Sequence, residues 1–425
     1  MMTRARRRRL RLLAQWRDWA NLLPLDLVEE ISGRLLSLDV AEYLRFRAVC
    51  RPWRGLTADP RKAGLLDSRF RPRNWMVLSI IPDAGPHRRL LNLATAASLG
   101  VDLPALSSHC HICDVNGLLL LYHKPTATIR LLDPLTSALT EFPAISSIVP
   151  AVPLDHHTVL AINGAAFDDS TSPPTLLLCL RGGLATIIFA KPGDAHWTMV
   201  TPGRSTHPRN YKHQQLLFFT LLSLGGRCYI SSPEGSVYLM ELEPLPRLVD
   251  VVDERCFAEP DNIWREHIMS FLVSDTGGRM LMVRYWSCME RFGGVEAYNP
   301  EDLFTGAASP AALRLVPVRS LGRHAVFIGL THCLHISTET FPSISADTIY
   351  LSCYHQQYRR FGIYHINKKN HPRTEPNDKF IFDITRYLYQ PAASPYNLDE
   401  YLVFYVDRRH RYSKACINHT SCLFR

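Results

Sequence analysis

From residue 74 onward the sequence is a succession of short apolar runs separated by turn-forming residues. The clearest unit lies between His109 and Phe142, where Asn116-Gly117, Lys124-Pro125 and Asp133-Pro134 separate the runs. Runs of this length that are rich in Val, Ile, Leu, Tyr and Phe, and that are bounded by Gly, Pro, Asn or Asp, predict β-strands. Strands that follow one another through such short turns predict an antiparallel meander.

A second unit of the same kind lies between Leu216 and Val252. Its strands are predicted at Leu216–Leu222, Arg227–Ser231, Ser236–Leu242 and Arg247–Val252. Less regular counterparts are Thr175–Val200, Ser270–Tyr285, Val295–Leu315, Ala325–Ile366 and Phe380–Val406. Repeated units of about 40 to 50 residues predict a β-propeller, here with six or seven blades, because ring closure leaves few exposed strand edges. A β-sandwich is the alternative, because no Trp-Asp or glycine-pair signature recurs.

The stretch Leu22–Arg54 has a helical pattern instead. A first helix is expected to begin at Leu23-Pro24, since proline fits the first helical turn, and its apolar face is formed by Leu27, Val28, Ile31 and Leu35. Gly33 should weaken this helix by about 1 kcal/mol relative to alanine.

A second helix is expected to begin after Asp39, which is a good N-cap. Glu42 is placed to complete a capping box, and Leu38 to form a hydrophobic staple with Tyr43. Pro52 should end or kink the helix just before Trp53. The two helices carry more apolar side chains than so small a unit can bury by itself.

The order Leu-Pro, Asp, Val-Cys-Arg and Trp-Arg within LPLDLVEEI and YLRFRAVCRPWR resembles the F-box, which ties substrate receptors to cullin-based ubiquitin ligases. Leu36 departs from the proline of many F-boxes, and an ordinary helical hairpin is the alternative. The resemblance implies a Skp-family adaptor as a partner and, through it, a cullin. The residues expected to contact the adaptor are Leu23, Pro24, Leu27, Val28, Ile31, Leu38 and Tyr43.

The strand-rich part also resembles a known family. DVNGLLLL with RLLDPLT, LLSLGGRCYI with SVYLMEL, and SLGRHAVFIGL with FPSISADTIYL are similar to the KIB-type domain that accompanies F-boxes in plant proteins. This resemblance implies a propeller that serves as a platform for a target protein. The expected fold class is thus an N-terminal all-α F-box followed by an all-β, propeller-like domain.

The expected divisions are a basic arm at residues 1–20, the F-box at 21–60, a linker at 61–73 and the propeller at 74–425. Six of the nine net positive charges belong to the arm, so the rest of the chain does not favour nucleic acid as a partner. The arm is a nuclear-import signal, an organellar transit peptide or a solvated tail. Nucleus or cytoplasm is the expected location, with organellar targeting left open.

Motifs of enzymes and of cofactor sites are missing from the sequence. It has no phosphate-binding loop, no HExxH helix and no Gly-x-Ser-x-Gly elbow, so we expect neither catalysis nor a cofactor. The cluster from His109 to Cys113, with Cys333 and His335 as distant partners, offers zinc ligands, but a strand would point them to alternate faces. We therefore expect no metal.

Several further features limit the function classes. No run of eighteen apolar residues suggests a membrane span. Eleven cysteines without framework spacing predict reduced thiols inside the cell. His156-His157 and Asp168-Asp169 are read as solvated loop residues. Target binding is expected on loops at one propeller end, with candidates around His156-His157, Asp168–Pro174, Thr201–Asn210 and Ser287–Gly294.

The sequence thus predicts a substrate receptor of an SCF-type ubiquitin ligase, in which the F-box binds the adaptor and the propeller binds a target protein. A propeller interaction protein that acts outside a ligase is the main alternative. A propeller hydrolase is the third possibility.

Overall fold

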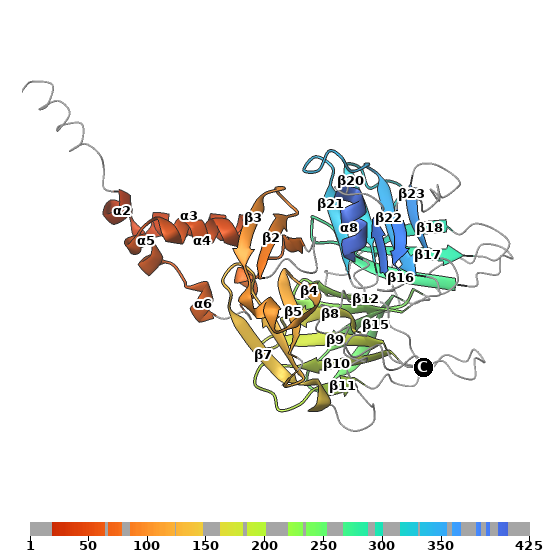
Figure 1. Cartoon of the computed structure of the whole chain (residues 1–425), viewed down its shortest axis with the longest axis horizontal. Helices are drawn as coiled ribbons and strands as arrows, with labels where there is room; N and C mark the ends of the chain where they lie inside the picture. The colour runs from red at the N-terminus through yellow and green to blue at the C-terminus, as the bar shows by residue number, and fades with distance from the viewer. Residues whose placement is uncertain are drawn as a thin grey trace, which may run out of the picture.

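The computed structural model consists of a helical N-terminal region and a ring of mainly antiparallel sheets (Figure 1). The structure describes residues 19–63, 67–78, 86–123, 125–147, 162–181, 185–200, 220–232, 235–252, 267–287, 294–300, 315–329, 332–354, 359–366, 380–383, 388–391 and 398–406. None of the described helices combines the length and the apolar composition that a membrane span requires.

Helices α2 to α5, which we call the helical unit, form the first part of the described chain. They are α2 (Trp19–Leu22), α3 (Leu25–Leu38), α4 (Val40–Val49) and α5 (Arg51–Leu56). Helix α6 (Pro60–Ala63) and the 3-10 helix η1 (Ser68–Phe70) follow. Figure 1 shows the helical unit projecting to one side of the sheets.

The described residues contain five four-stranded blades. The first blade consists of β4 (Cys110–Val115), β5 (Leu118–His123), β6 (Thr128–Leu132) and β7 (Leu139–Ala144), and the second of β8 (Ile162–Asp168), β9 (Thr175–Arg181), β10 (Ala185–Ala190) and β11 (Thr198–Val200). The third consists of β12 (Thr220–Leu224), β13 (Arg227–Ser231), β14 (Val237–Glu241) and β15 (Arg247–Val252), and the fourth of β16 (His267–Ser274), β17 (Met280–Ser287), β18 (Gly294–Pro300) and β19 (Leu315–Pro317). The fifth consists of β20 (His324–Ile328), β21 (Cys333–Ser337), β22 (Thr348–Tyr354) and β23 (Arg359–His365). The first four blades are antiparallel meanders, and the fifth has the order β21-β20-β22-β23.

A three-stranded sheet, which we call the entry sheet, precedes the blades in the chain. It consists of β1 (Trp75–Leu78), β2 (His87–Asn92) and β3 (Ser98–Asp102). Val77 and Leu90 pack against the first blade, whereas Met76 and Leu91 on the opposite face pack against the fifth blade. The entry sheet therefore fills the space between the last blade and the first.

The core consists of six apolar clusters, one at each contact between neighbouring sheets of the described chain. Between the first and second blades, for example, Phe142 stacks on Trp197 with ring centroids 6.0 Å apart, and the Trp197 indole donates to the carbonyl of Pro143. Because both faces of each blade are covered in this way, the ring is closed by burial of apolar surface.

Helix α8 (Leu398–Val406) completes the contact between the fifth blade and the entry sheet. Leu402 and Val406 are fully buried there, and the backbone of Gly329 lies so close to α8 that a Cβ would fall 2.0 Å from the carbonyl oxygen of Val406. The Tyr405 hydroxyl donates to Asp114 at the end of β4. The C-terminal helix thus reaches the first blade (Figure 1).

The prediction of a propeller is confirmed, whereas the prediction of six or seven blades is wrong for the described chain. Two predicted units, Ser270–Tyr285 and Val295–Leu315, are halves of a single blade, β16–β19. The last predicted unit, Phe380–Val406, is a two-stranded hairpin of β24 (Phe380–Asp383) and β25 (Leu388–Pro391), followed by helix α8. Tyr and Val favour strands, but in α8 Val403, Tyr405 and Val406 pack together on a helical face.

Residues 70–73 cross one end of the propeller, which we call the linker end. The Arg71 guanidinium is buried, donates to both carboxylate oxygens of Asp169 at 2.7 and 3.1 Å, and lies 4.0 Å from the ring centroid of Phe167. Burial lowers the pKa of Arg71, and the pair with Asp169 offsets part of this effect. An arginine guanidinium remains charged in proteins. Pro72 contacts the predicted Asn116-Gly117 turn, which joins β4 and β5.

The contact of Gly117 with Pro72 yields a first prediction. Gly117 has a φ of +81°, and a Cβ there would lie 1.9 Å from the Pro72 carbonyl oxygen. Gly117→Ala should lower the free energy of unfolding by roughly 2–5 kcal/mol, because backbone strain and a clash add together. Gly193→Ala is the matched control: its φ is +88° but its Cβ would meet no atom within 4 Å, so only strain of about 1–2 kcal/mol is expected.

Chemical denaturation of both variants measures these losses. Equal destabilisation by the two substitutions would show that the linker yields at Gly117 and is not fixed there.

Candidate functional site

The helical unit is organised around the start of α4. Asp39 caps this helix as predicted, since its Oδ1 accepts from the amide of Ala41 at 3.0 Å. The expected capping box is not formed: the Asp39 amide donates to the carbonyl of Leu35 at 2.8 Å, and the Glu42 carboxylate pairs with Arg45. The end of α3 thus provides the bond that Glu42 was expected to make.

The interior of the helical unit is held by aromatic and charged side chains. Phe46 stacks on Trp53 with ring centroids 4.6 Å apart, and the Tyr43 hydroxyl donates to the carbonyl of Ala58 at 2.7 Å. Arg47 is buried, donates to the Thr57 hydroxyl at 2.9 Å and also to two backbone carbonyls. Pro52 lies in the first turn of α5, so the helix breaks at Cys50 and Trp53 belongs to the next helix.

Large apolar side chains on the outside of the helical unit are its most unusual feature. Eight of the ten exposed large apolar residues of the described chain belong to it: Trp19, Leu22, Leu25, Leu27, Ile31, Leu38, Val49 and Leu56. Leu27 and Ile31 are one helical turn apart on α3 and therefore share a face. Helices α4 and α5 cover only the adjoining face, where Val28 and Ser32 are buried.

The predicted contact residues separate into two groups. Leu27, Ile31 and Leu38 are 45%, 38% and 72% exposed, and Pro24 is also exposed, while Leu23 is half-buried. Val28 and Tyr43 are buried, so they hold the helices together and do not belong to the exposed surface.

The predicted staple is wrong for the same reason. Leu38 faces solvent, while Tyr43 packs on Phe70 with ring centroids 5.6 Å apart. Sequence reasoning also missed Leu25 on α3 and Val49 and Leu56 on α4 and α5. Since both sides of α3 are apolar, its periodicity alone does not indicate which side is covered.

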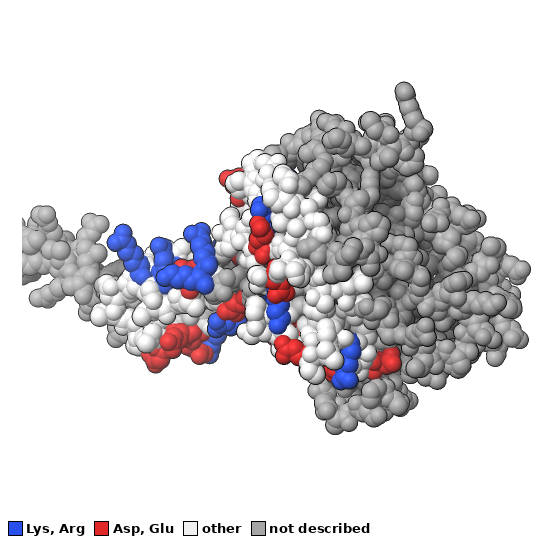
Figure 2. Space-filling view, turned by 90° about the horizontal axis from the view of Figure 1, so that it is seen from below, with Lys and Arg blue, Asp and Glu red and all other residues white. Residues whose placement is uncertain are grey.

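Charges on the helical region are largely separated by sign, apart from Arg34 and Arg45, which pair with Glu30 and Glu42. Figure 2 shows Lys and Arg gathered along one side of this region and Asp and Glu along the other. The exposed charges of these helices include Asp26, Glu29 and Glu30 on α3, Arg51 and Arg54 on α5, and Arg61 and Lys62 on α6. Such a pattern beside an apolar surface favours one orientation of a bound partner.

The loop Asp168–Pro174 proves to be structural where it joins the linker. Asp168 is fully buried and accepts from the amides of Ser170 and Cys228 at 2.9 and 3.1 Å. Asp169 pairs with Arg71. The reading of these two aspartates as solvated residues is therefore wrong, and the signal that sequence reasoning missed is a partner 98 residues away in the chain.

The other predicted target loops can be sorted by the strands beside them. His156-His157, Thr201–Asn210 and residues 288–293 lie outside the described residues. The β8–β9 turn is at the linker end, and the first four blades are antiparallel meanders. Strands β7, β11 and β17 therefore end at the opposite end, which we call the far end. Asp168–Pro174 therefore lies at a different end from the connections that contain the other three loops.

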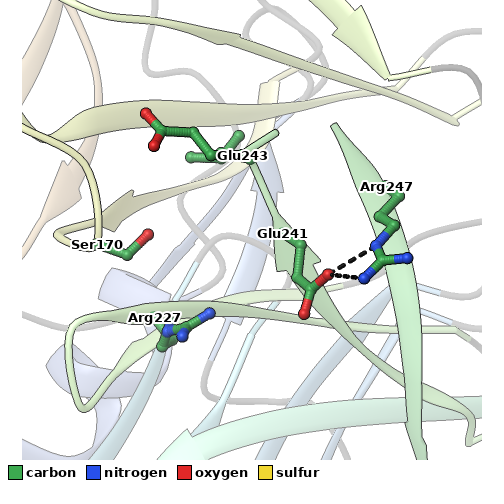
Figure 3. A pocket seen from close by; sticks show the side chains of 6 residues that line it. Ser170, Arg227, Glu241, Glu243 and Arg247 are labelled. Carbon is green, nitrogen blue, oxygen red and sulfur yellow. Dashed lines mark hydrogen bonds and ion pairs between the residues drawn. The ribbon is translucent and has the colours of Figure 1, made fainter. Parts of the chain in front are cut away.

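A polar hollow of about 380 Å³ opens at the linker end. Figure 3 shows the Glu241–Arg247 pair, joined at 2.6 Å, and, on the other side of the hollow, Arg227 and Ser170. Glu243 lies beside it and is 3.6 Å from Lys191. Three of the four charged side chains that line the hollow form ion pairs, which is an arrangement typical of a solvated surface.

The cluster from His109 to Cys113 lies at the start of β4. His109 hydrogen-bonds to the carbonyl of Ala105 at 2.7 Å, and Cys113 is buried. His335 is elsewhere, stacked on His324 with centroids 4.5 Å apart, and burial lowers its pKa to about 4. Within the described ranges, no three His, Cys, Asp or Glu side chains gather as metal ligands.

Comparison with solved structures finds matches of low similarity only. The β-propeller domain of Cps50 (Swd1) from Myceliophthora thermophila is 9% identical, with a TM-score of 0.34 over 68% of this chain and 81% of that one. A provisionally assigned 6-phosphogluconolactonase of Bacteroides uniformis is 13% identical, with a TM-score of 0.32 over 75% and 94%. No curated protein matches the chain.

A family model gives a direct assignment. The model described as the KIB1-4 beta-propeller matches residues 71–383. The match begins at Arg71, where the chain enters the linker end, and it includes the entry sheet and all five blades. It covers well over half of the sequence, and the chain therefore belongs to the KIB1-4 β-propeller family.

Proposed function

We propose that this chain is the substrate-receptor subunit of an SCF-type ubiquitin ligase, with the helical unit as an F-box that binds a Skp-family adaptor. The observation that carries the proposal is the concentration of exposed apolar side chains on α2 to α5. Apolar surface of this kind is stabilised by burial against a partner, and the charges beside it supply a polar rim.

The propeller supports the other half of the proposal. Propellers of this family fit a role as protein-binding platforms, and in the proposed complex the propeller holds a target protein near the ubiquitin-charged enzyme. The chain itself would make or break no bond. It would act by raising the effective concentration of a target lysine near the thioester. The alternative is a propeller interaction protein that acts outside a ubiquitin ligase, and failure of the chain to bind an adaptor would favour it.

The far end is the better candidate for the target site. At the linker end, residues 70–73 cover the first two blades through Arg71 and Pro72. The helical unit approaches the propeller through this same segment. A target at the far end would meet no contact from the linker residues described above.

The exposed surface of α3 generates a second prediction. The double variant Leu27→Ala, Ile31→Ala should weaken adaptor binding at least tenfold, about 1.4 kcal/mol, because each side chain contributes apolar area to the contact. Leu139→Ala is the matched control, since this leucine on β7 is 43% exposed and Leu27 is 45% exposed. Calorimetric titration with purified adaptor measures both. Equal affinity of the double variant and the control would contradict the F-box assignment.

A third prediction concerns the basic arm, most of which lies outside the described residues. We propose nucleus or cytoplasm as the location, with the arm acting on location and not on assembly. Deletion of residues 3–17 should shift the distribution of a fluorescent fusion in cells and leave adaptor affinity unchanged. An unchanged distribution would identify the arm as a solvated tail.

A fourth prediction separates the two ends of the propeller. Once affinity purification has identified a target, Gly-Ser replacement of the connections β7–β8, β11–β12 and β17–β18 should each be tested for target capture. At least one replacement should abolish capture while adaptor binding persists. The control is Leu245→Arg on the β14–β15 turn at the linker end, where the leucine is 74% exposed. Loss of capture only in this control would place the target at the linker end.

A further inference from the structure

The start of α4 is joined to the propeller by the same carboxylate that caps the helix. Oδ1 of Asp39 accepts from the Trp75 indole at 2.7 Å, and Oδ2 accepts from the Asn92 amide at 3.1 Å. Trp75 and Asn92 belong to β1 and β2 of the entry sheet and lie 36 and 53 residues away in the chain. One side chain therefore receives three hydrogen bonds from two structural units.

The partners of Asp39 are themselves fixed. Asn92 is fully buried, and its Oδ1 accepts from the amides of Ala94 and Thr95 at 2.8 and 3.1 Å, which directs its NH₂ group toward Asp39. Trp75 is buried in the cluster that also contains Ala41 of α4. Because packing holds Trp75 and two backbone amides hold Asn92, their hydrogen bonds to Asp39 define one placement of helix α4 relative to the entry sheet.

The helical unit is attached to the propeller at a second place. Tyr43 of α4 packs on Phe70, and the next residue, Arg71, is bound to Asp169. The helical unit is thus held at the entry sheet through Asp39 and at the second blade through residues 70–71. Two separated attachments resist rotation, which a single one allows.

We propose that Asp39 is a positioning residue that fixes the direction in which the propeller presents a bound protein to the partner of the helical unit. This inference rests on the proposed function for its biological meaning, but the coupling itself does not depend on it. Transfer to a target lysine depends on geometry, so a loose joint lowers the effective concentration of that lysine without weakening either binding step.

Substitutions at Asp39 can separate its two tasks. Serine is a good N-cap but is too short to reach the entry sheet, so Asp39→Ser should keep α4 and lose the joint. Asparagine keeps Oδ1 for Ala41 and Trp75, but its NH₂ group would face the NH₂ group of Asn92, donor against donor, so Asp39→Asn should weaken the coupling only in part. Trp75→Phe removes the indole donor from the other side and leaves Asp39 unchanged.

The direct measurement is the distance distribution between two spin labels in the full-length chain. Labels attached through ketone-bearing residues at Ala48 and Leu245, both exposed, leave the native cysteines in place. The unsubstituted chain should give one narrow distribution and Asp39→Asn one of intermediate width, whereas Asp39→Ser and Trp75→Phe should at least double the width. An unchanged width in both of the latter variants would overturn the proposal.

Adaptor affinity provides the functional control. In Asp39→Ser it should stay within threefold of the unsubstituted chain, whereas its loss would mean that Asp39 acts on the adaptor surface and would overturn the positioning role. With an identified target, ubiquitin transfer should lose kcat at an unchanged KM, and an unchanged kcat would also count against it. If no form binds adaptor, the proposed function fails, while the distance distributions still decide whether Asp39 couples the two units.

Discussion

Every sheet of the propeller has two apolar faces, and neither can be left in water. This constraint accounts for most of the architecture. Successive residues of a strand point to opposite faces, so a sheet that is apolar on both faces needs a neighbour on each side. Further sheets are therefore added until the ring closes on itself. Five four-stranded blades do not close the ring by themselves in the described chain. The entry sheet has Met76 on one face and Val77 on the other and fills the remaining place.

Local features were predictable from sequence where local chemistry decides them. The Asn116-Gly117 turn has positive φ at both residues, as a tight hairpin turn requires, and β4 to β7 lie close to the predicted positions. The cap at Asp39 was predictable for the same reason, because it depends on residues within one turn of helix.

Other features depend on partners that are distant in the sequence. Val28 and Leu27 are adjacent and both apolar, yet one is buried and the other exposed because α4 and α5 cover only one side of α3. From the sequence Asp168 looks like a loop residue, but in the structure its carboxylate accepts a hydrogen bond from the amide of Cys228 on β13. Helix α8 has the composition of a strand, and its position against the fifth blade determines its form. The candidate surface was therefore predicted as a region, and its exact residues needed the packing of three helices.

The ring closes where the fifth blade and helix α8 pack against the entry sheet. The entry sheet follows the helical unit directly in the chain, whereas α8 comes after all five blades. During synthesis the helical unit is complete long before this contact can form, because about 350 residues separate α5 from the end of α8. At ribosomal rates of about 5–20 residues per second, this interval is roughly 20–70 s. Throughout it, the apolar side chains of the helical unit are available to a partner while the propeller is still open. The order of elements along the chain therefore permits the helical unit to be bound before the propeller is able to hold anything.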